Sequence, residues 1–203
     1  MTDRPQPLTL PDNPIQAFDQ WFAEAGTSEP NDPNAAALAT ATPSGAPSVR
    51  MVLVKQIDQR GFCFFTNAQS QKGTELAANP QAALCFHWKS LRRQVRVEGS
   101  VLDLPDAEVD TYFHSRGRRS QLGAAVSQQS RPLASREQLE QEVQQFTEAH
   151  PGEVPRPSYW RGYILVPAAI ELWMDGTDRL HNRFRYTRDA QSPSGWTRIR
   201  LYP

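Results

Sequence analysis

The feature that most constrains the fold is a long series of short runs rich in β-branched and aromatic residues, each bounded by turn residues. Runs of this kind are typical of strands in an antiparallel sheet, and so many of them favour a sheet that closes into a barrel. A length of 203 residues fits a single domain, residues 1–203. The predicted strands are AALATATP, PSVRMVLVKQID, GFCFFTN, AALCFHWK and RQVRVEGSVLDL, followed by YILVP, AIELWMD, NRFRYTRD and GWTRIRLYP near the C-terminus.

Helices are expected before and between these strands. Asn13-Pro14 favours a helix start, because Pro is well tolerated in the first turn. A short helix is expected in SQKGTELAANP, and a longer helical region from Pro105 to about Arg116 that continues through SQLGAAV. Ser135 can cap another helix, with Gln138 as its capping-box partner. The fold class is therefore α+β, mainly antiparallel β, with peripheral helices, and the polar, Pro-rich residues 1–12 are expected to be flexible.

Charge and cysteine content exclude several classes of function. Lys plus Arg and Asp plus Glu each total 22, so a nucleic-acid-binding or membrane-binding protein is not indicated. Two cysteines within apolar runs predict buried free thiols, and the N-terminus has no apolar signal region, which favours a cytoplasmic protein. The four histidines are scattered without metal-ligand spacing, so no metal site is predicted.

Positive charge is concentrated near the C-terminus, in DRLHNRFRY. If this segment is a strand, side-chain alternation places Arg179, His181 and Arg183 on one face. Three such groups repel one another unless an anion lies among them, which indicates a binding site. The alternative is a solvated edge strand.

Three further motifs could hold anions. Tyr112, Arg116 and Ser120 are four residues apart, so on one helix they would offer three donors to a phosphate, although they could equally be ordinary surface residues. In RMVLVK, Arg50 and Lys55 would face opposite sides of a strand and serve different anions. TNAQSQKG places Lys72 where a helix begins, a common site for phosphate. Together these motifs predict two phosphate sites on one barrel.

The order of these motifs resembles that of the pyridoxine (pyridoxamine) 5′-phosphate oxidase family, from about Asn34 to the C-terminus. RMVLVK, FFTNAQSQKG, RRQVRVEG, YFHSRGRRSQLGA, SQQS and IELWMDGTDRLHNRFRY stand in the family's order and spacing. The chain departs from the family in four places. It has Arg4 but no nearby Tyr in the N-terminal segment, Leu172 in place of an aromatic residue, Met174 after the signature Trp, and Gln71 in place of a frequent basic residue.

This resemblance implies an FMN-binding split β-barrel that works as a homodimer with FMN at the interface, residues 160–203 supplying dimerisation and active-site strands. Arg50, Lys72 and the Thr66 region would hold the FMN phosphate. The flavin and its ribityl chain would be lined by Met51, Val52, Leu53, Val54, Lys55, Phe65, Gln71, Gln94, Trp173 and Arg183, with Gln129 and Ser130 also reaching FMN. Lys55, Tyr112, Arg116 and Ser120 would grip the substrate phosphate, and Arg179 and His181 would bracket the pyridine ring as the catalytic residues.

The implied reaction is the oxidation of pyridoxine 5′-phosphate and pyridoxamine 5′-phosphate to pyridoxal 5′-phosphate, with O₂ reduced to hydrogen peroxide. Two alternatives stay open at this point. One is another flavin oxidase on the same scaffold, of the phenazine-pathway type, which would have no reason to keep a complete substrate-phosphate grip. The other is a non-catalytic protein that binds FMN or a vitamin B6 phosphate, because the binding and catalytic residues nearly coincide.

Overall fold

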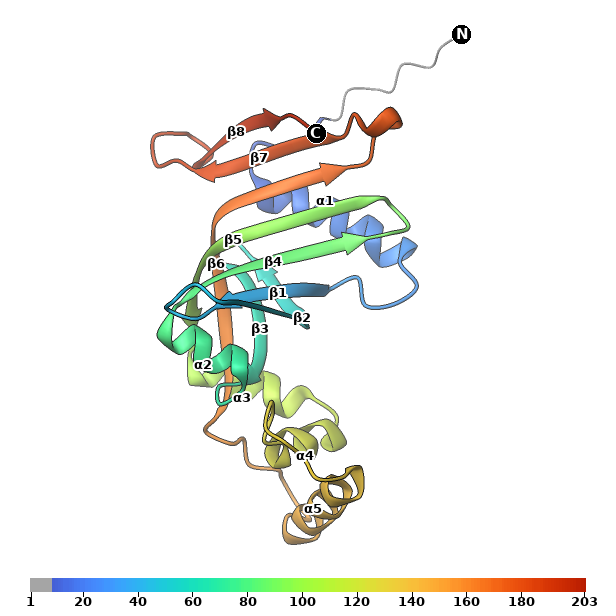
Figure 1. The fold of residues 1–203 in the computed structure, drawn as a ribbon, viewed down its shortest axis with the longest axis vertical. Coiled ribbons are helices and arrows are strands. Elements are labelled where there is room, and N and C mark those ends of the chain that lie inside the picture. The colour runs from blue at the N-terminus through green and yellow to red at the C-terminus, as the bar shows by residue number, and fades with distance from the viewer. Residues whose placement is uncertain (1–8) are drawn as a thin grey trace.

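A computed structural model describes residues 9–203, which form one antiparallel sheet surrounded by helices (Figure 1). The strand order is β3-β2-β1-β4-β5-β6-β7-β8, and an additional pairing of β3 with β6 closes the first six strands into a barrel. The strands are β1 (Ala35–Ala41), β2 (Pro47–Asp58), β3 (Gly61–Asn67), β4 (Gln81–Trp88), β5 (Arg93–Asp103), β6 (Trp160–Met174), β7 (Asn182–Arg188) and β8 (Trp196–Leu201). The helices are α1 (Pro14–Ser28), α2 (Gln71–Ala78), α3 (Asp106–Ser115), α4 (Arg118–Val126), α5 (Arg136–Ala149) and the 3₁₀ turn η1 (Thr177–Arg179). The predicted α+β fold with a barrel and peripheral helices is confirmed.

Strand β6 belongs both to the barrel and to the sheet extension, which is the part of the sheet that β7 and β8 add beyond the barrel. Its first half pairs with β3, its second half pairs with β7, and β5 runs beside both halves. YILVP and AIELWMD are therefore one continuous strand, where two were expected. The pairing of β5 with β6 shifts register between Glu98 and Gly99, and a Cβ on Gly99 would lie 2.0 Å from the Val166 carbonyl oxygen. Only glycine allows this close approach, which lets β6 pass from one set of partners to the other.

The barrel core is closed on one side by α1. Asn13 caps this helix by accepting a hydrogen bond from the Ile15 backbone N–H at 2.9 Å, and Pro14 occupies the first turn, as predicted. Phe18 then enters an aromatic cluster, with its ring 5.1 Å from that of Phe62 and 5.0 Å from that of Phe86. Burial of aromatic rings contributes strongly to the stability of a fold. Helix α1 is therefore part of the hydrophobic core that fills the barrel.

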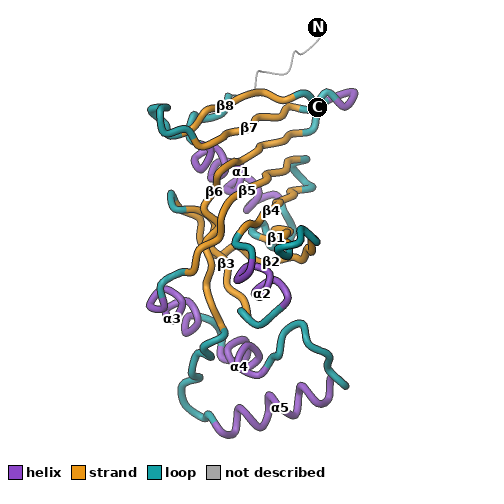
Figure 2. Tube along the Cα trace, turned by 60° about the vertical axis from the view of Figure 1, so that its left-hand side comes forward, coloured by secondary structure: helices purple, strands orange, loops and turns teal. Residues whose placement is uncertain are grey.

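The remaining helices follow the barrel strands. Figures 1 and 2 place α4 and α5 at one end of the molecule and β7 and β8 at the other. Ser135 caps α5 by accepting a bond from the Gln138 backbone N–H at 3.1 Å, as predicted. The Gln138 side chain, however, donates to Glu142 at 2.8 Å along the helix, and within residues 9–203 no return bond to Ser135 completes a capping box.

The N-terminal segment that was expected to be flexible falls partly outside the described residues. Residues 9–12 of this segment are ordered against the sheet extension. Leu10 is buried in the core, and the Pro11 carbonyl accepts a hydrogen bond from the Tyr186 hydroxyl at 2.8 Å. The buried Leu10 side chain and the hydrogen bond from Tyr186 to Pro11 therefore hold the chain in place just before α1. No helix among residues 9–203 is long and apolar enough to span a membrane.

Candidate active site: one cavity with two cationic ends

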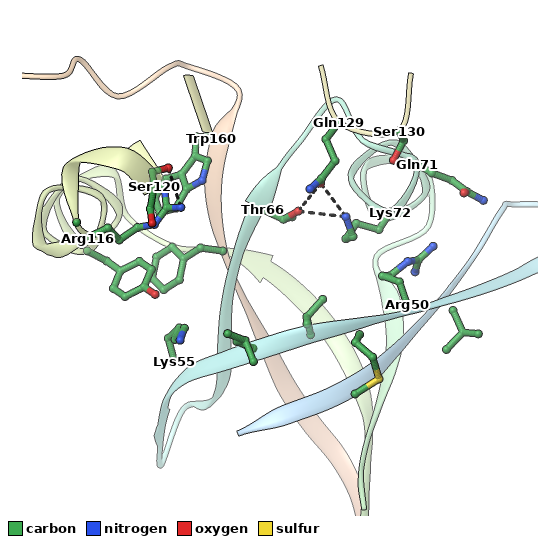
Figure 3. A pocket seen from close by; sticks show the side chains of 17 residues that line it. Arg50, Lys55, Thr66, Gln71, Lys72, Arg116, Ser120, Gln129, Ser130 and Trp160 are labelled. Carbon is green, nitrogen blue, oxygen red and sulfur yellow. Dashed lines mark hydrogen bonds between the residues drawn. The ribbon is translucent and has the colours of Figure 1, made fainter. Parts of the chain in front are cut away.

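A cavity of about 780 Å³ lies between β2, β3, α2 and the junction of α3 with α4 (Figure 3). It brings together most of the residues predicted from sequence. These are Arg50, Met51, Val52, Leu53, Lys55, Phe65, Thr66, Gln71, Lys72, Tyr112, Arg116, Ser120, Gln129 and Ser130. It is also lined by Val49, Gly117 and Trp160, which sequence reasoning missed. No local motif marked Trp160, the first residue of β6, as a cavity residue.

Lys72 and Arg50 form one cationic end of the cavity. The Lys72 ammonium group donates to the Gln129 Oε1 atom at 2.9 Å, to Thr66 Oγ1 at 3.2 Å and to Ser70 Oγ at 3.3 Å. Burial lowers the pKa of Lys72, and the nearby Arg50 charge lowers it further. A bound anion would oppose both effects by stabilising the ammonium charge, so this end is suited to a phosphate. Ser70 is also the N-cap of α2, so Lys72 lies in the first turn of that helix.

Lys55 and Arg116 lie at the other end of the same cavity, beside Tyr112 and Ser120 (Figure 3). The prediction that three of these residues share one helical face is wrong. Helix α3 ends at Ser115 and α4 begins at Arg118, because Arg116 takes an extended conformation. The break nevertheless keeps their side chains together in one cavity.

The Arg116 guanidinium is the least satisfied group in the cavity. Its Nη2 atom donates to the Ser120 carbonyl at 3.0 Å, while Nη1 is buried and is the one such side-chain atom without a partner among residues 9–203. The guanidinium lies 5.0 Å from the centre of the Trp160 ring. Burial lowers the pKa of Arg116 and raises that of Tyr112. An unpaired buried donor is costly, so the geometry favours an anionic ligand here.

Strand β2 forms the floor between the two ends. Val54 was expected to line the flavin, but its side chain is buried in the barrel core and does not line the cavity. Alternation alone does not explain this, because Arg50 and Val52 have the same parity as Val54 and line the cavity. The pairing of β2 with β3 shifts register directly after Val54. Val49, Met51 and Leu53 form an exposed apolar row, with 68%, 64% and 39% of their surface accessible. Arg50 and Lys55 were expected on opposite faces, yet both line one cavity, at its two ends.

A second group of predicted residues does not line this cavity. Gln94, Trp173 and Arg183 are direct neighbours across β5, β6 and β7. Arg179 and His181 precede β7 in the segment that contains η1. The expectation that Arg179 and His181 belong to a strand is wrong. Asp178 and Arg179 have φ values of 56° and 63°, so the backbone turns there and β7 begins only at Asn182.

Carboxylates that sequence reasoning did not assign fix this second group. The His181 ring lies 4.7 Å from that of Trp173, and its Nδ1 atom lies 3.1 Å from Asp175 Oδ1. Arg183 donates through Nε to Glu171 Oε1 at 2.9 Å. The positive charge of Arg183 is thus balanced within the chain, whereas a ligand had been expected to balance it. Within residues 9–203, no group of three or more His, Cys, Asp or Glu side chains could hold a metal ion.

A closed barrel of this strand order, with an apolar floor between two cationic ends, defines the class of split-barrel flavin proteins. The family model described as Pyridoxamine 5′-phosphate oxidase matches residues 23–150. A second, described as Pyridoxine 5′-phosphate oxidase C-terminal dimerisation region, matches residues 160–203. The chain belongs to the pyridoxamine 5′-phosphate oxidase family.

Relatives and solved structures agree with this assignment. A pyridoxine/pyridoxamine 5′-phosphate oxidase of Rhodospirillum rubrum is 57% identical over 197 residues, which cover 94% of this chain and 96% of that protein. One of Gluconobacter oxydans is 52% identical over 204 residues and covers 100% of both chains. The crystal structure of PhzG from Burkholderia lata, in complex with tetrahydrophenazine-1-carboxylic acid, has a TM-score of 0.88 at 34% identity and covers 95% of this chain and 94% of that one. An FMN-binding protein of Nostoc punctiforme, with a TM-score of 0.74 at 16% identity over 97% of this chain and 100% of that one, shares the fold.

Proposed function

We propose that this protein oxidises pyridoxine 5′-phosphate and pyridoxamine 5′-phosphate to pyridoxal 5′-phosphate, with FMN as cofactor and O₂ as electron acceptor. It is an oxidoreductase that acts on the CH–OH or CH–NH₂ group at C4′. The observation that carries this function is the cavity itself, in which two cationic ends are separated by an apolar floor. Two phosphorylated molecules lying side by side match this arrangement.

The end of the cavity with Arg50 and Lys72 is assigned to the FMN phosphate. Lys72 is held by Thr66 and Gln129, so its position is set before the cofactor arrives. Ser130, Gln71 and Phe65 line the same cavity and are assigned to the cofactor. The backbone and side chains of Met51, Val52 and Leu53, which form the apolar floor, are assigned to the flavin ring.

The other end is assigned to the substrate phosphate. Arg116 offers its unpaired Nη1, and Tyr112 and Ser120 add hydroxyl donors beside it. Lys55 lies between this end and the floor, so it can contact both substrate and cofactor. Charge-assisted hydrogen bonds contribute about 1.5–3 kcal/mol each. The phosphate can therefore supply most of the binding free energy of a small substrate.

The second group of predicted residues completes the site from the partner subunit. The protein is a homodimer, and residues 160–203, which match the dimerisation region, contain Trp173, Arg179, His181 and Arg183. The row of Val49, Met51 and Leu53 is exposed in one chain and needs a cover. We place FMN at this interface, with the partner's β6–β7 segment and Gln94 over the flavin. Free thiols at Cys63 and Cys85 fit a cytoplasmic protein.

Bound FMN would supply the two-electron acceptor for C4′, with O₂ as the final acceptor. The protein itself positions the substrate and stabilises the charges that form during the reaction. Arg179 orients the substrate ring over the flavin, and His181 binds the ring oxygen. Asp175 Oδ1 lies 3.1 Å from His181 Nδ1, and the Gly176 N–H donates to the same atom, so the ring is held in place and Nε2 can assist proton transfer from the alcohol or amine. Closure of the interface over the cavity excludes water from the reacting atoms.

Purified homodimer supplied with FMN is expected to form pyridoxal 5′-phosphate from either substrate, with consumption of O₂ and release of an equal amount of hydrogen peroxide. Product absorbance and an oxygen electrode measure this directly. Binding of substrate without turnover would identify a carrier. Equal activity on tetrahydrophenazine-1-carboxylic acid, which carries no phosphate, would support the rival oxidase activity. The complete phosphate grip of Lys55, Tyr112, Arg116 and Ser120 argues against that rival.

A further inference from the structure

A buried carboxylate lies behind the phosphate end of the cavity without lining it. Glu75 is on α2 and only 7% of its surface is accessible. Its Oε2 atom accepts hydrogen bonds from the hydroxyls of Thr40 and Ser48, and from Arg50 Nη2 at 3.4 Å. Its Oε1 atom accepts a bond from the Gln71 side-chain amide at 3.0 Å. Glu75 therefore touches a residue assigned to the FMN phosphate and a second that lines the same cavity.

Arg50 does not depend on Glu75 for its position. Its Nη1 atom donates to the Leu38 carbonyl at 3.2 Å and to Thr40 Oγ1 at 2.5 Å, and its Nη2 atom also donates to the Ser48 hydroxyl. These bonds come from β1 and β2, the strands on which the guanidinium lies. What Glu75 adds to this arrangement is chiefly a negative charge.

That charge is permanent under ordinary conditions. Hydrogen bonds from Ser48 and Thr40 lower the pKa of Glu75 to about 2. The phosphate end of the cavity thus contains two cations, Arg50 and Lys72, and one carboxylate that shares Arg50 with any incoming anion. A phosphate dianion at this end meets repulsion from Glu75 and competition for Arg50 Nη2.

We propose that Glu75 sets the affinity of the cofactor-phosphate site, by balancing part of the Arg50 charge so that the dianion is held less tightly than two free cations would hold it. This inference rests on the proposed placement of the FMN phosphate. Glu75 acts on the phosphate through its charge and through Arg50, so its effect is specific to a phosphomonoester. The flavin ring and ribityl chain, which lie elsewhere in the cavity, do not experience this effect.

The test is Glu75→Gln in the full-length dimer freed of flavin. Titration with FMN and with riboflavin, which lacks the phosphate, is followed by quenching of flavin fluorescence. We expect the Kd for FMN to fall about fivefold to tenfold, and the Kd for riboflavin to stay within about twofold. The new amide oxygen can take the place of Oε2, and the Gln71 amide can rotate to present its own oxygen to the new amide group. Removal of the charge also makes FMN binding depend more steeply on salt.

An unchanged or higher Kd for FMN in folded Glu75→Gln overturns the inference, as does an equal change for riboflavin. The matched control is Glu108→Gln, which neutralises a surface carboxylate paired with Arg60 at 3.0 Å and should change neither Kd. If Glu75→Gln does not fold, Gln71→Glu carries the test. An added carboxylate beside Arg50 and Glu75 is expected to raise the Kd for FMN about tenfold, and the Kd for riboflavin by less, because riboflavin carries no phosphate. No change in that variant overturns the inference.

Arg50→Ala separates this inference from the proposed function. The Kd for FMN is expected to rise about 100-fold, while the Kd for riboflavin stays within about twofold. If Arg50→Ala changes neither Kd, or both equally, the FMN phosphate lies elsewhere and the proposed site itself fails. If Arg50→Ala behaves as expected and Glu75→Gln does not, only the role of Glu75 is refuted.

Discussion

Replacement of Arg116 by Ala is expected to lower kcat/KM for pyridoxine 5′-phosphate by about 100-fold, because two or more charge-assisted bonds to the phosphate are lost. The unpaired Nη1 atom is the physical reason, since a ligand is needed to satisfy it. FMN binding should be normal, because the other cationic end of the cavity is untouched. Steady-state kinetics with each phosphorylated substrate, and with unphosphorylated pyridoxine, measure the effect.

The comparison of substrates makes this result specific. Activity on unphosphorylated pyridoxine, however low, should be the same in Arg116→Ala and in the unchanged protein. Arg119→Ala is the matched control, because Arg119 is exposed in the first turn of α4, three residues after Arg116, and does not line the cavity. An Arg116→Ala variant with normal kcat/KM for the phosphorylated substrate would remove the substrate phosphate from this end of the cavity.

Replacement of Glu171 by Ala is expected to lower the free energy of unfolding by about 2 kcal/mol, because it removes a buried carboxylate that accepts charge-assisted hydrogen bonds from two partly accessible guanidinium groups. Only 4% of the Glu171 surface is accessible, and its carboxylate pairs with Arg183 at 2.8 Å and with Arg96 at 3.5 Å. Arg183 is assigned to the flavin, so FMN binding should weaken as well. Urea unfolding at one fixed dimer concentration measures the stability.

A more exposed carboxylate in the same network provides the control. Glu98 pairs with Arg96 at 2.5 Å and with Arg185 at 2.9 Å, and 33% of its side chain is accessible. Glu98→Gln should therefore cost less than about 1 kcal/mol. Equal losses in the Glu171 and Glu98 variants would mean that burial of Glu171 has no special effect on stability.

Local sequence patterns predicted the helix starts and the strands correctly, because these features depend on local interactions. Asn13, Ser70 and Ser135 each stand as a helix N-cap, and the β-rich runs form the expected strands. Arg50, Lys55 and Lys72 line one cavity because β2, β3 and α2 are close in sequence and fold together. Family resemblance, more than any single motif, connected these positions to two phosphates.

The patterns failed where the backbone leaves regular structure. The positive φ values at Asp178 and Arg179 break an alternation that looked continuous, and Arg116 interrupts a spacing that suited a helix. The partners of Arg50 and Arg183 were not predicted either. Glu75 and Glu171 reach them across β-sheet registers and helix packing, which no local motif encodes.

The length of β6 has a genetic consequence. Its 15 residues extend over at most roughly 50 Å, with cavity-lining Trp160 at one end and Trp173 near the other. In the proposed dimer, one polypeptide would therefore supply half of each of two sites. Arg116→Ala and Arg179→Ala, each with strongly reduced activity alone, should complement one another when co-expressed. Random pairing would give one intact site in every mixed dimer and about a quarter of normal activity.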